Sequence, residues 1–203
     1  MNNKTFNIKK FVIILIGVIL LTATAFISSY FKKENNTDIG QPLLKITAPA
    51  KLKADFRDSF SVDVTVSRLG GEAYPAASLS LGFDSSNLEF LGIEEGNVTV
   101  GSDSDSSLPE WSVNVERSND IGQINILYLD VSGGRYAFSD DRISGEQNVL
   151  LRLKFRLRGS AAPGDIYELS VEDAVFAATD SEKSLASISG TLQTQNGRII
   201  LED

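Results

Sequence analysis

The chain of 203 residues contains no cysteine and no histidine. Without cysteine it has no disulfide, no thiolate metal site, no cysteine nucleophile and no lipid-modified cysteine. Without histidine it lacks the commonest general base and metal ligand in proteins. These two absences exclude the most frequent kinds of catalytic and metal centre, and they leave carboxylates as the main candidates for chemistry.

Positive charge is scarce and unevenly distributed. The chain has 19 Lys and Arg against 27 Asp and Glu, a net charge of -8. Residues 1–33 hold five lysines and no acid, so the remainder has 14 basic and 27 acidic residues, a net charge of -13. Such a domain repels nucleic acid and anionic lipid, so we expect no nucleic-acid partner. The acidity suits a cationic or calcium-loaded partner, although solubility accounts for it equally well.

A long uncharged run lies near the N-terminus. Phe11 to Phe31 has no charged residue, and lysines flank it on both sides. Its length is close to the roughly 20 residues that span a bilayer, and the leading lysines favour an N-terminus inside and the rest of the chain outside. We therefore expect residues 1–33 to be a single-pass anchor in the cell membrane, followed by a linker over 34–42. A usable A-x-A cleavage site at Ala23–Ala25 leaves a secreted protein with a cleaved signal peptide as the alternative.

From residue 43 to residue 203 apolar and polar residues alternate with a period of two. The clearest case is Leu151 to Leu157, where apolar residues alternate with basic ones, and Asn196-Gly197 is a strong hairpin-turn signal. No segment of this region has helical periodicity. The pattern predicts an antiparallel sandwich of nine or ten short strands, with long loops at 101–110 and 135–147. The basic strip Arg152 to Arg158 is expected to pair with acids on a neighbouring strand.

Carboxylates offer no convincing centre. Asp103 and Asp105 lack the spaced glycine and terminal glutamate of a helix-loop-helix calcium site. Adjacent acids could supply a glycosidase pair, but such pairs are expected by chance in so acidic a chain. They occur at 94–95, 140–141 and 172–173. We predict no enzyme, no metal site and no cofactor.

The segment GQINILYLDVSGG, from Gly122 to Gly134, predicts a central strand that is apolar on both faces. Asn125 shares one face with Leu127 and Leu129, because side chains alternate along a strand. Asparagine is a poor core residue, so this side is expected to face outward. Two exposed leucines among polar groups are typical of a protein interface. The alternative is that the loop 135–147 folds over the leucines.

Four segments, in this order and without large gaps, resemble a cohesin domain. They contain alternating strands, and the second also has an aromatic-Asp pair, a turn and a closing Glu-Gly: SVDVTVS (61–67), AASLSLGFDSSNLEFLGIEEG (76–96), INILYLDVSGG (124–134) and NVLLRLKFRLRGSAAPG (148–164). The resemblance covers about residues 43–203. It implies a nine-stranded jelly-roll β-sandwich and a non-catalytic module that binds dockerins in cellulose-degrading assemblies.

The resemblance also implies where the partner binds. In cohesins the sheet that contains the strand of Leu127 docks the partner helices, with the strands of Ala76 and Ser112 beside it. We therefore predict one partner-binding face, formed by Ala76, Ser78, Ser80, Ser112, Asn114, Asn125, Leu127, Leu129 and Asp130. The expected protein is a monomer that displays a dockerin-bearing partner, such as a polysaccharide-degrading enzyme.

Two alternatives remain open. A carbohydrate-binding module on a related jelly roll would bind polysaccharide through exposed aromatic residues, for which Tyr74, Tyr136 and Phe138 are the candidates. A structural domain of the cell envelope would bind no ligand.

Overall fold

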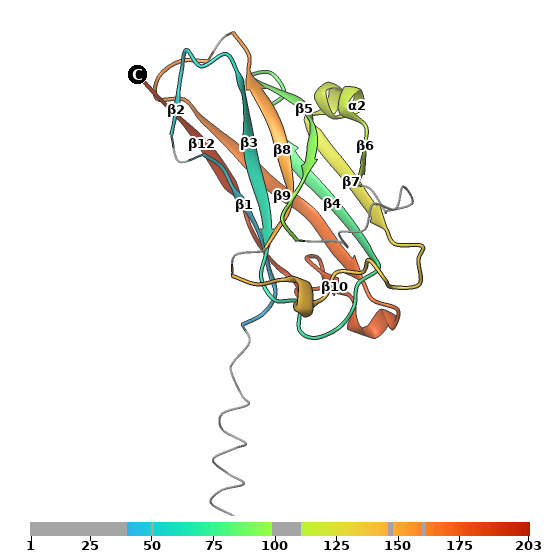
Figure 1. Cartoon of the computed structure of the whole chain (residues 1–203). Helices are drawn as coiled ribbons and strands as arrows, with labels where there is room; N and C mark the ends of the chain where they lie inside the picture. Colours follow the sequence, from blue (N-terminus) through green and yellow to red (C-terminus); the bar gives the residue numbers. More distant parts are fainter. Residues whose placement is uncertain (1–39, 50, 99–110, 146–147, 160) are drawn as a thin grey trace, which may run out of the picture. The chain divides into compact units, whose positions relative to one another are not determined.

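The computed structural model describes residues 40–49, 51–98, 111–145, 148–159 and 161–203 (Figure 1). Residues 41–203 form one compact unit. The predicted membrane anchor and the loop 101–110 lie outside the described residues. Within the described residues, no helix is both long enough and apolar enough to cross a membrane.

The unit is a sandwich of two β-sheets. Neighbouring strands of the first sheet are antiparallel, except that the two at one edge, β11 and β1, are parallel. Its five strands, in spatial order, are β11 (Gln193–Gln195), β1 (Leu43–Thr47), β3 (Ser59–Val66), β8 (Val149–Leu157) and β5 (Leu88–Glu95).

The second sheet has seven strands and lies behind the first in Figure 1. Its main path, in spatial order, is β2 (Leu52–Lys53), β12 (Gly197–Glu202), β9 (Ile166–Ala177), β4 (Ala76–Phe83), β7 (Gln123–Leu129) and β6 (Ser112–Val113). The short β10 (Leu185–Ala186) also pairs with β9. In the described connections there are two single turns of 3-10 helix, Asp140–Arg142 and Ser181–Lys183, and the α-helix α2 (Val115–Ile121).

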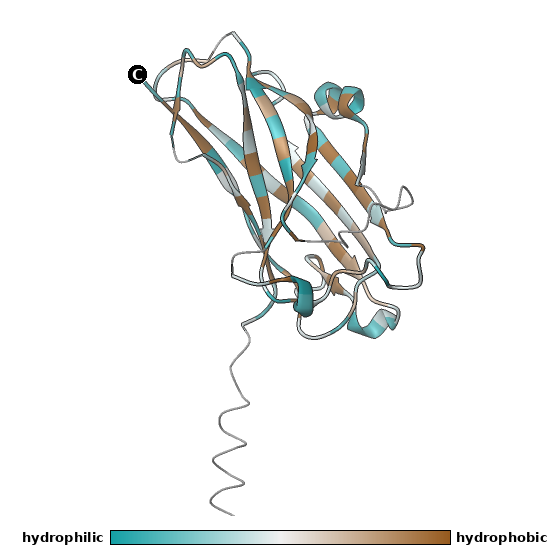
Figure 2. Ribbon diagram, in the orientation of Figure 1, coloured by the Kyte–Doolittle hydropathy of each residue, from teal (hydrophilic) through white to brown (hydrophobic). Residues whose placement is uncertain are grey.

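The core lies between the sheets, where alternate residues of each strand point inward. Figure 2 shows the result as apolar and polar bands that alternate along the strands. At one end of the core Phe155 packs against Phe83 and Phe90, with ring centroids 5.5 and 5.6 Å apart. Trp111 is partly buried against the core, and its ring centroid lies 5.1 Å from that of Tyr128.

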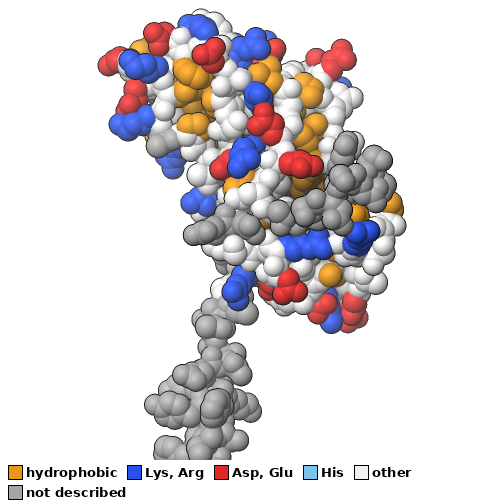
Figure 3. Space-filling view, in the orientation of Figure 1, with side chains coloured by type: hydrophobic (Ala, Val, Ile, Leu, Met, Phe, Trp, Pro, Cys, Tyr) orange, Lys and Arg blue, Asp and Glu red, His pale blue; other side chains and the backbone are white. Residues whose placement is uncertain are grey.

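The basic strip of β8 pairs as predicted. Opposite charges on the two neighbouring strands lie within ion-pair distance of it, and Figure 3 shows acidic and basic side chains next to one another on this face. The nitrogen-to-oxygen distances are 3.2 Å for Arg152–Asp63, 3.0 Å for Lys154–Glu94 and 3.7 Å for Arg156–Glu89. Charge on the outside of the first sheet is therefore largely compensated.

Helix α2, Val115–Ile121, was not predicted. Residues 111–115 read as a continuing strand, but the strand ends at Val113 and Asn114 becomes the N-cap of the helix. The Asn114 side chain accepts a hydrogen bond from the backbone nitrogen of Arg117 at 2.9 Å. Gly122 ends the helix with a positive φ of 69°, a conformation that favours glycine. The prediction that no segment after residue 43 is helical is wrong here.

Candidate protein-binding face

Strand β7 presents its two leucines outward, as the position of Asn125 predicted. Leu127 is 54% exposed and Leu129 is 53% exposed. The alternate residues, Ile124, Ile126 and Tyr128, are buried in the core. The strand is therefore apolar on both sides, and its outer side is open to solvent.

The register of the sheet places most of the predicted site residues on this same outer side. Ser78 of β4 stands opposite Leu127, and Ser112 of β6 stands opposite Leu127 on its other flank. Residues directly opposite in an antiparallel pair share a face. Seven predicted residues gather in this way: Ala76, Ser78, Ser80, Ser112, Asn125, Leu127 and Leu129.

Strand β9 adds residues to the face that sequence reasoning did not assign to it. It pairs with β4 on the side away from β7, so Ala177, Val175 and Asp173 stand opposite residues 76, 78 and 80. A register shift in the middle of this pairing interrupts the alternation of β9. The signal was present in the sequence, because the apolar alternation of Tyr167, Leu169 and Val171 stops at the acidic pair 172–173.

The described part of the loop 135–147 does not cover the leucines. Tyr136 and Phe138 turn into the core instead, and they are 3% and 1% exposed. The hydroxyl of Tyr128 donates a hydrogen bond to the Tyr136 carbonyl oxygen at 2.6 Å, and Phe138 pairs with the backbone of Tyr74. The interpretation in which this loop folds over the leucines is wrong for the described residues.

A family model identifies the kind of domain that has this face. The family model described as the cohesin domain matches residues 45–196. The chain belongs to the cohesin family. Cohesin domains are non-catalytic modules, so the predictions of the family and of no enzymatic activity are confirmed.

Solved cohesins have the same fold. The Coh-OlpA–Doc918 complex of Clostridium thermocellum contains one that is 20% identical, with a TM-score of 0.61 over 80% of this chain and 99% of that chain. The sixth cohesin of scaffoldin B from Acetivibrio cellulolyticus, solved with a mutant Cel5 dockerin, is 20% identical, with a TM-score of 0.58 over 80% and 100%. CaCohA2 from Clostridium acetobutylicum is 17% identical, with a TM-score of 0.53 over 80% and 91%. No curated protein gives a significant match.

Asp130 of this cohesin domain faces inward, contrary to the prediction. It is buried, and its carboxylate accepts hydrogen bonds from the backbone nitrogen of Ser132 at 2.8 Å and from that of Tyr136 at 3.0 Å. Burial raises the pKa of Asp130, but hydrogen bonds from Ser132, Tyr136 and Gly134 outweigh it and hold the pKa below its ordinary value. Asp130 organises the loop after β7 and is not presented to a partner.

Asn114 also has a structural role that sequence reasoning missed. Its side chain caps α2 and is not part of the strand beside Leu127.

The aromatic residues considered for a carbohydrate-binding surface are not available to a sugar, because Tyr74, Tyr136 and Phe138 are all buried. None of these three residues offers a ring to a sugar.

Proposed function

We propose that this cohesin domain binds a dockerin module through the outer face of β9, β4, β7 and β6. The observation that carries the proposal is the pair of half-exposed leucines, Leu127 and Leu129, on the outer side of β7 between β4 and the edge strand β6. Small side chains surround them, among them Ala76 and Ser78, so a partner helix can approach the sheet closely. Two solved relatives are complexes with dockerin modules, which supports this choice of partner.

The energetics favour a contact centred on Leu127. Completing the burial of a half-exposed leucine contributes about 1 kcal/mol of hydrophobic free energy. Ser112, opposite Leu127 on the edge strand β6, places a polar group at the margin of the apolar contact. Apolar centres with polar rims are where the strongest contacts of an interface are found.

The test uses Leu127→Asp with Ile200→Asp as its matched control. Ile200 is 36% exposed, and it lies on β12, which is not part of the proposed face. Dockerin modules encoded in the same genome are produced singly, and their affinities for the three cohesin forms are measured. We expect Leu127→Asp to weaken binding by about 2 kcal/mol or more, roughly thirtyfold, while Ile200→Asp binds like the wild type.

Melting curves accompany the affinities, because Leu127 faces solvent and its replacement is expected to leave the fold nearly intact. Equal affinities for the wild type and Leu127→Asp would remove this face from consideration. If no dockerin from the genome binds the wild type, the proposed function itself fails.

We further propose that the domain is displayed outside the cell on a membrane anchor and holds a dockerin-bearing partner, such as a polysaccharide-degrading enzyme. The support is the uncharged run Phe11 to Phe31 and its flanking lysines. The full chain should fractionate with membranes and have an intact N-terminus by mass. Recovery of a soluble chain that begins at Phe26 would establish the secreted alternative.

A further inference from the structure

The proposed docking face changes from apolar to polar along its strands. Because β4 pairs with β7 on one side and with β9 on the other, directly opposite residues form rows across the three strands. The first two rows contain the exposed leucines and small or aliphatic neighbours: Leu129, Ala76 and Ala177, then Leu127, Ser78 and Val175. The next two rows are polar: Asn125, Ser80 and Asp173, then Gln123, Gly82 and Ser170.

A carboxylate lies over the middle strand at the polar end. Glu172 is the extra residue at the register shift of β9, because Ser80 pairs with Asp173 and Leu81 with Val171. Its Oε1 accepts a hydrogen bond from the Ser170 hydroxyl at 2.5 Å. A β-carbon added at Gly82 would lie only 2.6 Å from this oxygen, so the absence of a side chain there lets the carboxylate cross onto β4.

Asp173 adds a second negative charge beside the first. Its Oδ1 accepts hydrogen bonds from the Ala174 backbone nitrogen at 2.8 Å and from the Ser187 hydroxyl at 2.9 Å. Among the described residues no lysine or arginine forms an ion pair with Glu172 or Asp173. Strands β4, β6, β7 and β9 contain no basic residue at all.

The acids on the outer side of the first sheet differ from Glu172 and Asp173, because they have basic partners. Acids there, such as Glu94, are paired with basic residues of β8. On the second sheet the only basic residue that the register brings near this end is Arg198 of β12, which stands opposite Glu168, beyond the last β4–β9 pair. The docking face therefore has an apolar half and an uncompensated acidic half.

We propose that the dockerin helix recognised by this face presents an apolar contact and, on the same side, a lysine or arginine that pairs with Glu172 and Asp173. The inference rests on the proposed function and names the chemistry of its partner. The row of Leu127 and the row of Gly82 are four residues apart, about 13 Å along a strand. On a helix lying along the strands, a residue seven positions from the apolar contact is on the same side and about 10.5 Å further along, and a long basic side chain reaches the remaining distance.

The physical reason is the cost of burying unpaired charge. A neutral helix that covered Glu172 would remove its carboxylate from water without compensation, which opposes binding. A cation placed there turns the same group into an attractive contact and excludes partners that lack it. The acidic half of the face therefore discriminates between dockerins that make the same apolar contact with Leu127 and Leu129.

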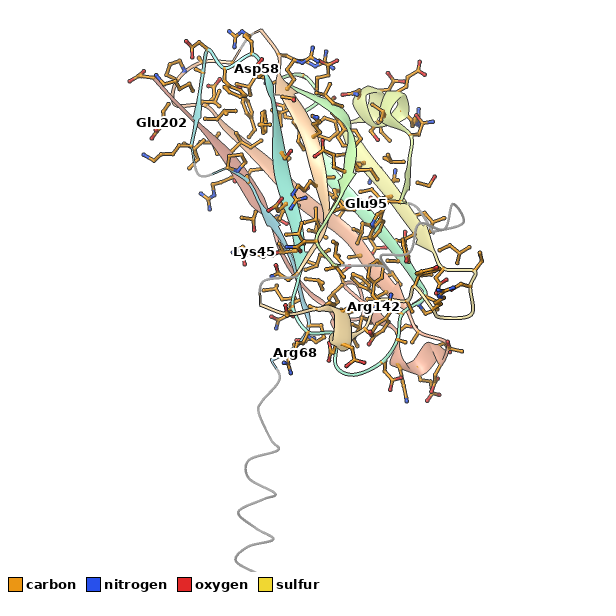
Figure 4. All side chains as sticks on the ribbon, viewed as in Figure 1. Lys45, Asp58, Arg68, Glu95, Arg142 and Glu202 are labelled. Carbon is orange, nitrogen blue, oxygen red and sulfur yellow. The ribbon has the colours of Figure 1, made fainter. Side chains whose placement is uncertain are left out.

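The test measures salt dependence with isosteric neutral variants. Glu172→Gln/Asp173→Asn keeps the hydrogen bonds to Ser170 and Ala174 but removes both charges. Its matched control, Asp55→Asn/Asp58→Asn, removes two exposed acids that precede β3 in the chain. Asp58 is labelled in Figure 4. The probes are the dockerin modules encoded in the same genome, measured in 50 mM and 500 mM NaCl. Melting curves check that every variant is folded.

We expect Glu172→Gln/Asp173→Asn to lose at least fivefold in affinity at low salt, and to lose most of the salt dependence of the wild type, because added salt screens such a pair. The control double variant should bind like the wild type. A dockerin in which the proposed basic residue on the docking side of the helix is changed to glutamate should lose affinity for the wild-type cohesin domain. The same dockerin should bind the Glu172→Lys/Asp173→Lys variant more tightly than it binds the wild type.

The outcomes separate the two proposals. If Leu127→Asp abolishes binding but the neutral acidic variant binds like the wild type, the docking face stands and the basic partner residue is overturned. If neither change matters, both are overturned, because the partner then binds elsewhere. Binding of dockerins that have no basic residue at the required spacing would also overturn the inference.

Discussion

The side chain of Asn119 closes the exposed edge of β5 at Phe90. Its amide nitrogen donates to the Phe90 carbonyl oxygen at 2.8 Å, and its amide oxygen accepts from the Phe90 nitrogen at 2.9 Å. These are the two hydrogen bonds that a neighbouring strand would make. A third bond, to the carbonyl oxygen of Val115 at 3.1 Å, ties the amide to its own helix. Helix α2 therefore protects this sheet edge against pairing with another chain.

Asn119→Ala should destabilise the domain by about 2 kcal/mol, because it leaves a partly buried backbone donor and acceptor without partners. Urea unfolding at neutral pH measures the change. Asp120→Ala is the matched control, because Asp120 is next to Asn119 in the chain and its side chain is exposed. Equal unfolding free energies for the two variants would show that water replaces the amide at no cost.

Asn114→Ala should lower the unfolding free energy by about 1 kcal/mol, since it removes the N-cap of α2. Dockerin affinity should stay unchanged, because the side chain belongs to the helix cap and not to the docking face. Asn114→Ser, which retains a capping oxygen, should recover most of the loss. A fall in affinity in a variant of full stability would restore Asn114 as a binding residue.

Alternation of side chains was the most informative feature of the sequence. It predicted the outward side of Leu127 correctly, because one misplaced asparagine is enough to orient a strand whose period is two. It also predicted that the basic residues of β8 pair with acids on a neighbouring strand. It could not say that Asp63 of β3 and Glu94 of β5 would flank them, since strand order depends on contacts distant in the sequence.

The same alternation misled where a short helix began. Val113 and Val115 fit a strand, yet a helix of seven residues starts at Val115. Its signals were an asparagine before the first turn and Gly122 after the last, which are typical caps.

The prediction that Asp130 belongs to the binding face also overlooked a local signal. An aspartate just before Ser132 and two glycines is the pattern of a side chain that binds its own loop, and it directs the carboxylate inward.

The unit Gln41–Asp203 should fold without residues 1–40 and without metal. Its strands bury their own core, and the described residues contain no group of three acids placed to hold an ion. Circular dichroism should show an all-β spectrum, and excess EDTA should change the melting temperature by less than about 2 °C. A larger fall after chelation would reveal a metal requirement, and refilling with Ca²⁺ or Mg²⁺ would identify the ion.

The buried carboxylate of Asp130 should make stability depend on pH in the acid range. Hydrogen bonds to its ionised form hold the pKa of Asp130 below the unfolded value of about 3.9. The stabilisation is therefore fully present above that value and is lost as the pH falls through the folded-state pKa. Asp130→Asn should be less stable than the wild type by about 1–2 kcal/mol at pH 7, with a smaller difference at pH 3.

Urea unfolding of the wild type and Asp130→Asn at pH 7, 5 and 3 measures this difference. Asp58→Asn is the control, because Asp58 is an exposed acid outside the loop that Asp130 organises. If the difference in unfolding free energy between wild type and variant narrows at low pH only for Asp130→Asn, the acid sensitivity belongs to the buried carboxylate. A gap that stays constant from pH 7 to pH 3 would mean that Asp130 acts through the shape of its hydrogen bonds, which an amide oxygen reproduces only in part, and not through its charge.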